Sequence, residues 1–389
     1  MLSFDNTEIA FKSKTDKALK RAHFLFSVIG KPSMVKIGKS ITEFALNIGL
    51  PIQGIIKKTI FEQFCGGETI EGCDAKIAEL YKYGVGTILD YSVEGKKEEK
   101  NFDETTEEII RTIEKAKGNP AIPFAVFKVT GISRFALLEK LNNEKAELTN
   151  DEKMEFQRIL ARVDKICQKG HELDVPVFID AEHYWIQDAI DRMAVSMMAK
   201  YNQEKALIFN TIQMYRVDRL AYLKNSVEKA RIGGYHYGIK LVRGAYMETE
   251  RERAKQMNYA DPIQPNKAAT DKAYNEALDY ILQHLDILAL CAGTHNEHSA
   301  AYLASEIEKY GIDKTDKRVY FAQLLGMSDH ISFNLSNAGY NVAKYVPYGP
   351  VKEVMPYLFR RAEENTSVAG QTSRELSLLN KEMKRRFSK

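Results

Sequence analysis

Eight short apolar runs, each separated from the next by a polar stretch that can form a helix, constrain the fold of this chain more than any other feature. The runs cover residues 87–91, 124–128, 175–180, 207–213, 239–243, 287–291, 319–323 and 342–345. This alternation is typical of buried parallel strands that are joined by crossover helices. Eight such units favour an α/β fold of the (β/α)8 TIM-like barrel type over an open doubly wound sheet.

The first eighty residues follow a different pattern, with helical spacing of apolar residues at 24–29 and 41–56 and Gly or Pro breaks between. We therefore predict an N-terminal helical region of residues 1–83 and a barrel domain of residues 84–389 that includes C-terminal helices. Within the polar stretch 94–117, Thr105 and Glu108 have the spacing of a capping box, which predicts a helix start there.

Composition excludes several classes of protein. The formal net charge is +3, and no basic stretch is interleaved with aromatic residues, so nucleic acid is not a predicted partner. The four cysteines form no Cys-x-x-Cys pair, which indicates a reducing compartment without a thiolate zinc site. No signal peptide, transit peptide or membrane-spanning run is visible, so the predicted location is cytoplasmic.

The two ends of the chain are basic. Residues 1–60 carry ten Lys or Arg against four acids, and residues 381–387 are also rich in Lys and Arg. These ends fit two interpretations: solvated termini, or a peripheral contact with the anionic surface of a membrane.

Polar residues stand at or just after the end of each apolar run. In (β/α)8 barrels the active site is built at the C-terminal ends of the strands. Any one of these residues could instead cap the following helix, but eight in succession favour a site. The residues are Asp90, Lys128, Asp180, Gln213, Arg243, Thr294-His295-Asn296, Gln323 and Tyr345.

Three classes of chemistry can be compared with these residues. A nucleophilic hydrolase is disfavoured because no Gly-x-Ser-x-Gly is present and Cys291 lies inside an apolar run. A metal-dependent hydrolase could use Asp180, Glu182, His183 and His295 as ligands, although the first run ends without a His pair.

The third class is a cofactor enzyme that acts on a small carboxylate. No strand is followed by Gly-x-Gly-x-x-Gly, so a nucleotide would be bound by the strand ends themselves. Lys240 and Arg243 suit this role, because they are cations next to the small residues Gly244 and Ala245. The alternative role of the two cations is in salt bridges with Asp180 and Glu182.

A charged stripe near the C-terminus also admits two interpretations. If the chain is helical after Pro356, then Tyr357, Arg360, Arg361 and Glu364 share one face. Adjacent arginines can bind a carboxylate in a fixed orientation, since each guanidinium is a planar fork. The alternative is a solvated helix face with an Arg360–Glu364 ion pair.

Several of these segments together resemble the proline dehydrogenase family, in order from about Gly84 to Asn365. The most specific segment is Arg-Arg-x-x-Glu-Asn at 360–365. The sequences of residues 89–94 and 345–357 are similar to those of the stand-alone, mitochondrial type of this family. The other segments are 240–246 (KLVRGAY), 294–296 (THN), 321–327 (FAQLLGM) and 179–182 (IDAE).

The resemblance implies FAD-dependent oxidation of L-proline to 1-pyrroline-5-carboxylate, with hydride transfer from C5 to the flavin N5, on a distorted barrel whose last helix lies over the strand ends. It implies that the substrate carboxylate is bound by Lys128, Arg360 and Arg361, and that Tyr345, Tyr357 and Leu325 line the proline ring. It places Asp180 near the reacting centre. The cofactor residues that it implies are Gln213, Lys240, Arg243, Ala245, Lys267, Thr294, His295, Asn296 and Glu364.

The resemblance further implies a membrane quinone as electron acceptor, a pyrroline-5-carboxylate dehydrogenase as a downstream partner, and a mitochondrial location if the source is eukaryotic. Many relatives have Arg at the position of Lys240 and Lys at the position of Arg243. The resemblance therefore does not decide which of these two cations reaches the flavin N5. Asp180, Tyr246 and solvent are alternative bases for the substrate amine. Hydroxyproline oxidation is an alternative that Tyr345 argues against, because its phenol would crowd a ring hydroxyl. A carboxylate-binding protein without chemistry is a further alternative.

Overall fold

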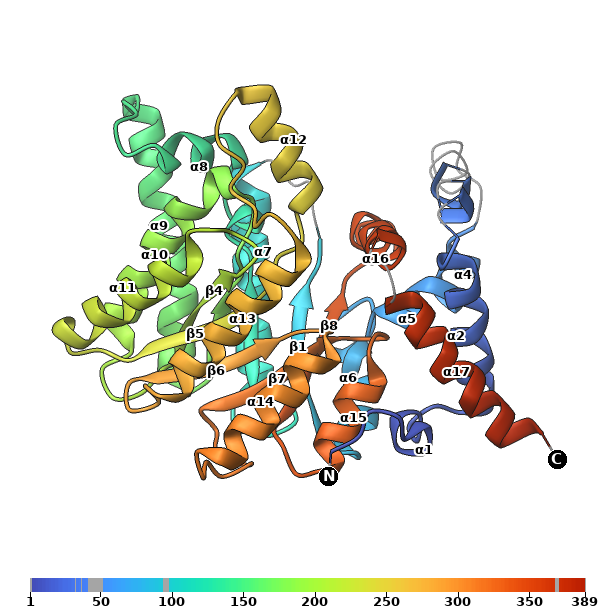
Figure 1. Ribbon diagram of the computed structural model, residues 1–389. Coiled ribbons are helices and arrows are strands. Elements are labelled where there is room, and N and C mark those ends of the chain that lie inside the picture. The colour runs from blue at the N-terminus through green and yellow to red at the C-terminus, as the bar shows by residue number, and fades with distance from the viewer. Residues whose placement is uncertain are drawn as a thin grey trace. The chain divides into compact units, whose positions relative to one another are not determined.

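The computed structural model describes residues 2–31, 33–35, 37–40, 52–93, 98–367 and 371–388, without the side chains of 363–367 and 371–372. Eight parallel strands form a closed barrel in chain order, and helices separate successive strands (Figure 1). The barrel prediction is thereby confirmed. The strands are β1 (Val85–Tyr91), β2 (Phe124–Phe127), β3 (Val177–Ile179), β4 (Ile208–Gln213), β5 (Tyr237–Val242), β6 (Leu288–Gly293), β7 (Val319–Leu324) and β8 (Val342–Tyr348).

The strands are buried along almost their whole length, as expected for a parallel sheet that is covered on both faces. Each predicted apolar run contains most of one strand, but the predicted end of the last run is wrong. β8 continues through Val346 and Pro347 to Tyr348, so Tyr345 lies inside this strand and not at its end.

The chain divides into two compact units. Unit 1 consists of residues 1–94 and 323–389, and unit 2 consists of residues 95–322. The predicted boundary at residues 83 and 84 stays a prediction. Within the described ranges, each helix is too short or too polar to cross a bilayer.

Unit 2 contains the helices that follow β1 to β6. The predicted helix start at Thr105 is wrong, because α7 already begins at Glu99. A capping box forms instead at Thr149 and Glu152, where each side chain bonds the backbone N–H of the other. The helices are α7 (Glu99–Ala116), η3 (Val129–Gly131), α8 (Phe135–Asn142), α9 (Asn150–Leu173), α10 (Tyr184–Tyr201), α11 (Arg219–Gly233), α12 (Met247–Met257), α13 (Lys267–Leu282) and α14 (Glu297–Lys309).

Unit 1 pairs β1 with β8 in register from Val85 opposite Val342 to Tyr91 opposite Tyr348. In Figure 1, α2 (blue) runs beside α17 (red), which brings an N-terminal and a C-terminal helix of unit 1 together. The helices of this unit are α1 (Thr7–Ala10), α2 (Asp16–Ile29), α4 (Gln53–Ile56), η1 (Lys57–Phe61), α5 (Glu62–Phe64), η2 (Glu71–Cys73), α6 (Asp74–Tyr81), α15 (Asp329–Asn337), α16 (Met355–Ser367) and α17 (Gln371–Phe387).

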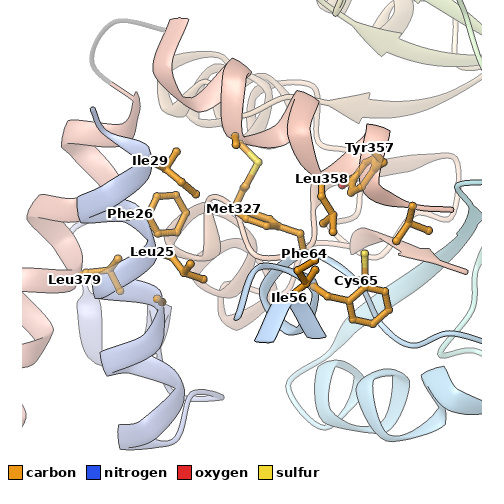
Figure 2. Close-up of a cluster of buried hydrophobic side chains, with 14 of the residues drawn as sticks. Leu25, Phe26, Ile29, Ile56, Phe64, Cys65, Met327, Tyr357, Leu358 and Leu379 are labelled. Carbon is orange, nitrogen blue, oxygen red and sulfur yellow. The ribbon is translucent and has the colours of Figure 1, made fainter. Parts of the chain in front are cut away.

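One hydrophobic core joins the N-terminal and C-terminal helices of unit 1 (Figure 2). Phe26 of α2 and Phe64 of α5 contact each other edge to face, with their ring centroids 6.3 Å apart. Leu358 of α16 and Leu379 of α17 belong to the same buried cluster. The burial of these apolar side chains therefore stabilises an arrangement that needs both ends of the chain.

A buried ionic cluster fixes β8 to α15 in unit 1. Lys344 of β8 is fully buried, and its Nζ lies 2.8 Å from Asp329 Oδ1 and donates to the carbonyl of Met327 at 2.8 Å. Lys14 Nζ lies 2.9 Å from the second oxygen, Asp329 Oδ2. Burial alone would raise the pKa of Asp329, but the charges of Lys14 and Lys344 hold this pKa below its usual range.

Candidate functional site

Five of the predicted site residues of unit 2 lie at the C-terminal ends of neighbouring strands. Lys128 follows β2, Asp180 follows β3, Gln213 is the last residue of β4, Arg243 follows β5, and Thr294 follows β6. Because β2 to β6 are parallel and paired in order, these ends share one edge of the sheet. The prediction that polar residues mark this edge is confirmed for unit 2.

Lys240 and Asp180 form a close ion pair at this edge. Lys240 lies within β5, opposite Thr211 on one side and Cys291 on the other. Its Nζ bonds Asp180 Oδ1, and the two residues are only 6% and 9% exposed. The salt-bridge alternative for Lys240 is thus realised with Asp180.

Arg243 is held by a hydrogen-bond cluster that contains several predicted cofactor residues. Its Nε donates to Asp271 Oδ1 at 2.8 Å, and its Nη1 donates to Thr294 Oγ1 at 2.7 Å. Lys267 Nζ bonds the other oxygen of Asp271, and Asn296 Nδ2 lies 3.4 Å from Asp271 Oδ1. The predicted alternative partner, Glu182, does not bind Arg243; Asp271 does.

Asp271 had no assigned role in the sequence analysis, although it joins Arg243 to Lys267. Burial raises its pKa, but hydrogen bonds from these two cations hold the pKa below its usual range. The spacing of Lys267 and Asp271, four residues apart on α13, was the available signal for this pair. The link from Asp271 to Arg243 spans 28 residues and had no local signal.

Gln213 presents a buried acceptor that has no donor among the described residues. Its Nε2 donates to the carbonyl of Glu182 at 3.0 Å, which fixes the orientation of the amide. Its Oε1 is buried, and no donor in the described ranges bonds it. An unmet buried acceptor at a strand end suits the N–H group of a bound ring, so this residue fits a flavin.

The chain next to Arg243 has a conformation that only glycine adopts readily. Gly244 has a φ of 131°, and a Cβ at this position would lie 2.4 Å from the ring of Tyr215. Ala245 follows with a single methyl group. The absence of a side chain at Gly244 therefore lets the backbone next to Arg243 pack directly against the ring of Tyr215, which follows β4.

His183, a proposed metal ligand, lies in a stack of rings. Its ring centroid is 4.5 Å from that of Trp185 and 4.1 Å from that of Tyr246. Asp180 is bonded to Lys240, and Glu182 accepts from Thr130. In the described part of the chain, no three His, Cys, Asp or Glu side chains form a metal-binding group. The ligand set of the metal-hydrolase alternative is therefore not assembled there.

Glu250 of α12 is a second titratable group that the sequence analysis missed. Its Oε1 accepts from the backbone N–H of Tyr184 at 2.7 Å, at the start of α10. Burial raises the pKa of Glu250 to about 7, against the lowering effects of Tyr184 and of the nearby charges of Arg216 and Arg253. An acid buried at a helix N-terminus in this way stabilises the helix when it is ionised.

In unit 1, the structure brings Leu325 and Tyr345 together. The N–H of Leu325 donates to the carbonyl of Tyr345 at 2.8 Å, and both side chains are buried. Tyr345 lies inside β8, as described above. The predicted ring-lining residues Leu325 and Tyr345 are therefore neighbours.

The predicted helical stripe also forms, on α16 of unit 1. The guanidinium of Arg361 lies 5.1 Å from the ring centroid of Tyr357, and these residues are 8% and 4% exposed. Arg360 is half-buried. The side chain of Glu364 lies outside the described residues, so the Arg360–Glu364 pair stays a prediction. A wholly solvated face is excluded by the burial of Tyr357 and Arg361.

Comparison with known proteins identifies similar chains. A family model described as proline dehydrogenase matches residues 73–374. The chain is 37% identical over 387 residues to "Proline dehydrogenase 1, mitochondrial" of Dictyostelium discoideum, covering 88% of this chain and 67% of that protein. It is 46% identical over 245 residues to the human protein of the same name, covering 62% of this chain and 41% of the human protein.

A solved structure shares the fold. Proline utilization A from Bdellovibrio bacteriovorus, inactivated by N-propargylglycine, aligns with a TM-score of 0.74 and 21% sequence identity. The alignment covers 95% of this chain and 40% of the Bdellovibrio protein. The chain thus spans about two fifths of the length of the Bdellovibrio and human proteins.

Proposed function

Since the chain belongs to the proline dehydrogenase family, we propose that it oxidises L-proline to 1-pyrroline-5-carboxylate with the help of bound FAD. The observation that carries the proposal is the family match over residues 73–374, which includes the whole barrel and α16. The proposed electron acceptor is a membrane quinone. A pyrroline-5-carboxylate dehydrogenase is the proposed downstream partner, and the basic N-terminal residues are proposed to contact a membrane surface, in mitochondria if the source is eukaryotic.

The residues present fit the proposed cofactor. When bound, FAD would supply the acceptor for the hydride that leaves C5 of proline. Gln213 would accept from the flavin ring through its unmet Oε1, and Arg243 with Lys267 would bind phosphate oxygens, which guanidinium and ammonium groups bind well. The full set that we propose to hold FAD is Gln213, Lys240, Arg243, Ala245, Lys267, Thr294, His295, Asn296 and Glu364.

The proposed substrate residues act by orientation. Lys128, Arg360 and Arg361 would bind the carboxylate of proline, and Leu325, Tyr345 and Tyr357 would pack against its ring. Fixing the ring in one orientation contributes several kcal/mol to catalysis, about 7 or more in favourable cases. Asp180, held in place by Lys240, is proposed to lie near the reacting centre and to be one candidate acceptor of the amine proton.

The first test is the colour of the purified protein. We expect visible flavin absorbance, which L-proline bleaches under anaerobic conditions because the flavin takes up two electrons. Trans-4-hydroxy-L-proline serves as the comparison substrate, and we expect slower bleaching with it, since the buried phenol of Tyr345 leaves little room for a ring hydroxyl. A colourless protein with stoichiometric zinc would instead support the metal-hydrolase alternative.

A second test concerns Gln213. We expect Gln213→Leu to weaken FAD binding about tenfold, as measured by equilibrium dialysis. Leucine is similar in size to glutamine but lacks the buried acceptor oxygen. Gln63→Leu is the matched control, since Gln63 is also buried and donates to a backbone carbonyl, that of Gly326, at 2.9 Å in unit 1. Equal FAD affinity of the wild type and Gln213→Leu would remove Gln213 from the cofactor site.

A further inference from the structure

Glu182, two residues after Asp180, holds the turn that follows Lys128. Its carboxylate is buried, with the residue only 4% exposed. One oxygen accepts from the backbone N–H of Thr130 at 3.0 Å, and the other accepts from the Thr130 hydroxyl. Thr130 belongs to the tight turn η3, which begins directly after Lys128. Both donors of one turn residue therefore converge on one carboxylate.

The backbone of the same residue holds Gln213. The carbonyl of Glu182 accepts from Gln213 Nε2 at 3.0 Å. Its N–H donates to Gln187 Oε1 at 2.7 Å, and Gln187 Nε2 donates to Asp191 Oδ1 at 2.8 Å. Gln187 and Asp191 are buried residues of α10, so the backbone of Glu182 is anchored to this helix.

Burying this carboxylate is costly, and its neighbours offset only part of the cost, because the pKa of Glu182 stays above its usual value. Burial raises the pKa of Glu182, while the bonds from Thr130 and the charge of Lys128 act in the lowering direction. The proposed chemistry assigns no proton transfer to Glu182. Glu182 bonds the turn residue Thr130, and its pKa responds to the charge of the neighbouring Lys128, so it has the properties of a structural support for that cation.

We infer that Glu182 is a positioning residue that orients Lys128 through its carboxylate and Gln213 through its backbone carbonyl. The inference rests on the proposed function, in which Lys128 binds the substrate carboxylate and Gln213 binds FAD. The two roles use different groups of one residue. A change that weakens the bond between Thr130 and the Glu182 carboxylate should therefore affect substrate binding. It should leave the bond between Gln213 and the Glu182 carbonyl, and thus FAD binding, intact.

Thr130→Val tests the role of the Glu182 carboxylate, because it removes the hydroxyl that donates to this carboxylate and keeps the shape of the side chain. We expect the KM for L-proline to rise about tenfold, with kcat changed about threefold or less, since a lost hydrogen bond to a charged group has roughly this effect. The Kd for FAD should stay within about twofold, because the bond from Gln213 to the carbonyl of Glu182 is unchanged. Thr130→Ser, which keeps the hydroxyl, should restore the KM.

Ser133→Ala is the matched control within the same segment. The Ser133 hydroxyl donates to the carbonyl of Val129 at 2.7 Å and does not bond Glu182. It should lower the melting temperature about as much as Thr130→Val does, and change the KM about twofold or less. An equal rise in KM for Ser133→Ala and Thr130→Val would overturn the inference, because general loosening of the turn would then explain both.

Glu182→Gln provides the second variant, and amide hydrogen exchange provides a measurement that is independent of activity. We expect faster exchange in a peptide that covers residues 128–134 of Glu182→Gln, while exchange of β6 residues stays as in the wild type. Unchanged exchange and an unchanged KM would overturn the inference. If the wild type does not oxidise proline, the proposed function fails, yet the exchange data still decide whether Glu182 holds the turn.

Discussion

Replacing Arg361 with methionine is expected to raise the KM for L-proline by about two orders of magnitude or more, with FAD still bound. Arg361 is only 8% exposed and lies over the ring of Tyr357 on α16, so its charge is placed in a site of low dielectric. Methionine keeps the apolar stem that packs on Tyr357 and removes only the guanidinium. Steady-state kinetics with L-proline, together with the flavin content of the variant, measure this effect.

Arg374→Met is the control for the loss of one arginine in unit 1. Arg374 on α17 forms an ion pair with Asp5 at 2.8 Å at the surface, and such pairs contribute about 0–1 kcal/mol. Its kinetics should match the wild type. Arg360→Met should also raise the KM, because Arg360 is the second proposed carboxylate ligand. Unchanged kinetics of both Arg360→Met and Arg361→Met would mean that the arginine pair does not bind substrate.

Replacing Asp329 with leucine is expected to destabilise the protein by about 3–5 kcal/mol, because it leaves the charge of Lys344 buried without its anion. Lys344 is fully buried, and Asp329 is its ion-pair partner at 2.8 Å. Urea denaturation measures the change. Lys14→Met, which removes the second and more exposed cation bound to Asp329, should cost less.

The double variant Asp329→Leu with Lys344→Met isolates the pair. We expect it to be more stable than Asp329→Leu alone, since replacing both charges of a buried pair with apolar groups is often neutral or stabilising. A double variant that is no more stable than the single one would show that the ionic cluster is not the source of the loss.

The same cluster predicts a loss of stability in acid. The pKa of Asp329 is lower in the folded protein than in the unfolded chain, so its contribution is fully present above the unfolded pKa of about 3.9. The contribution is lost as the pH falls through the lower, folded value. The urea midpoint of the wild type should therefore fall more steeply below pH 4 than that of the double variant.

The barrel could be predicted because its strands are buried on both faces and so remain apolar throughout. The end of β8 could not, because Pro347 lies in the run that follows Tyr345 and suggests a loop. A strand directs its N–H groups alternately to its two neighbours, so one proline removes a single donor and the strand continues to Tyr348. Tyr345 consequently lies inside the strand.

The missed site residues share a physical cause. Thr130 and Glu182 are 52 positions apart, and Arg243 and Asp271 are 28 apart, so the spacing of residues within one element does not reveal these bonds. Local patterns also mislead when they lack context. Thr105 and Glu108 match a capping box in the middle of a helix, whereas the true box at Thr149 stands where the chain enters one.

The core shown in Figure 2 has a consequence for biosynthesis. Phe26 and Phe64 leave the ribosome early, but Leu358 and Leu379, which complete their cluster, are synthesised about 300 residues later. At a synthesis rate of about 5–20 residues per second, the apolar face of the early helices stays exposed for roughly 15–60 s before Leu358 and Leu379 are made. The nascent chain is therefore expected to depend on chaperones during this interval, and synthesis of the helices that carry Leu358 and Leu379 ends this dependence.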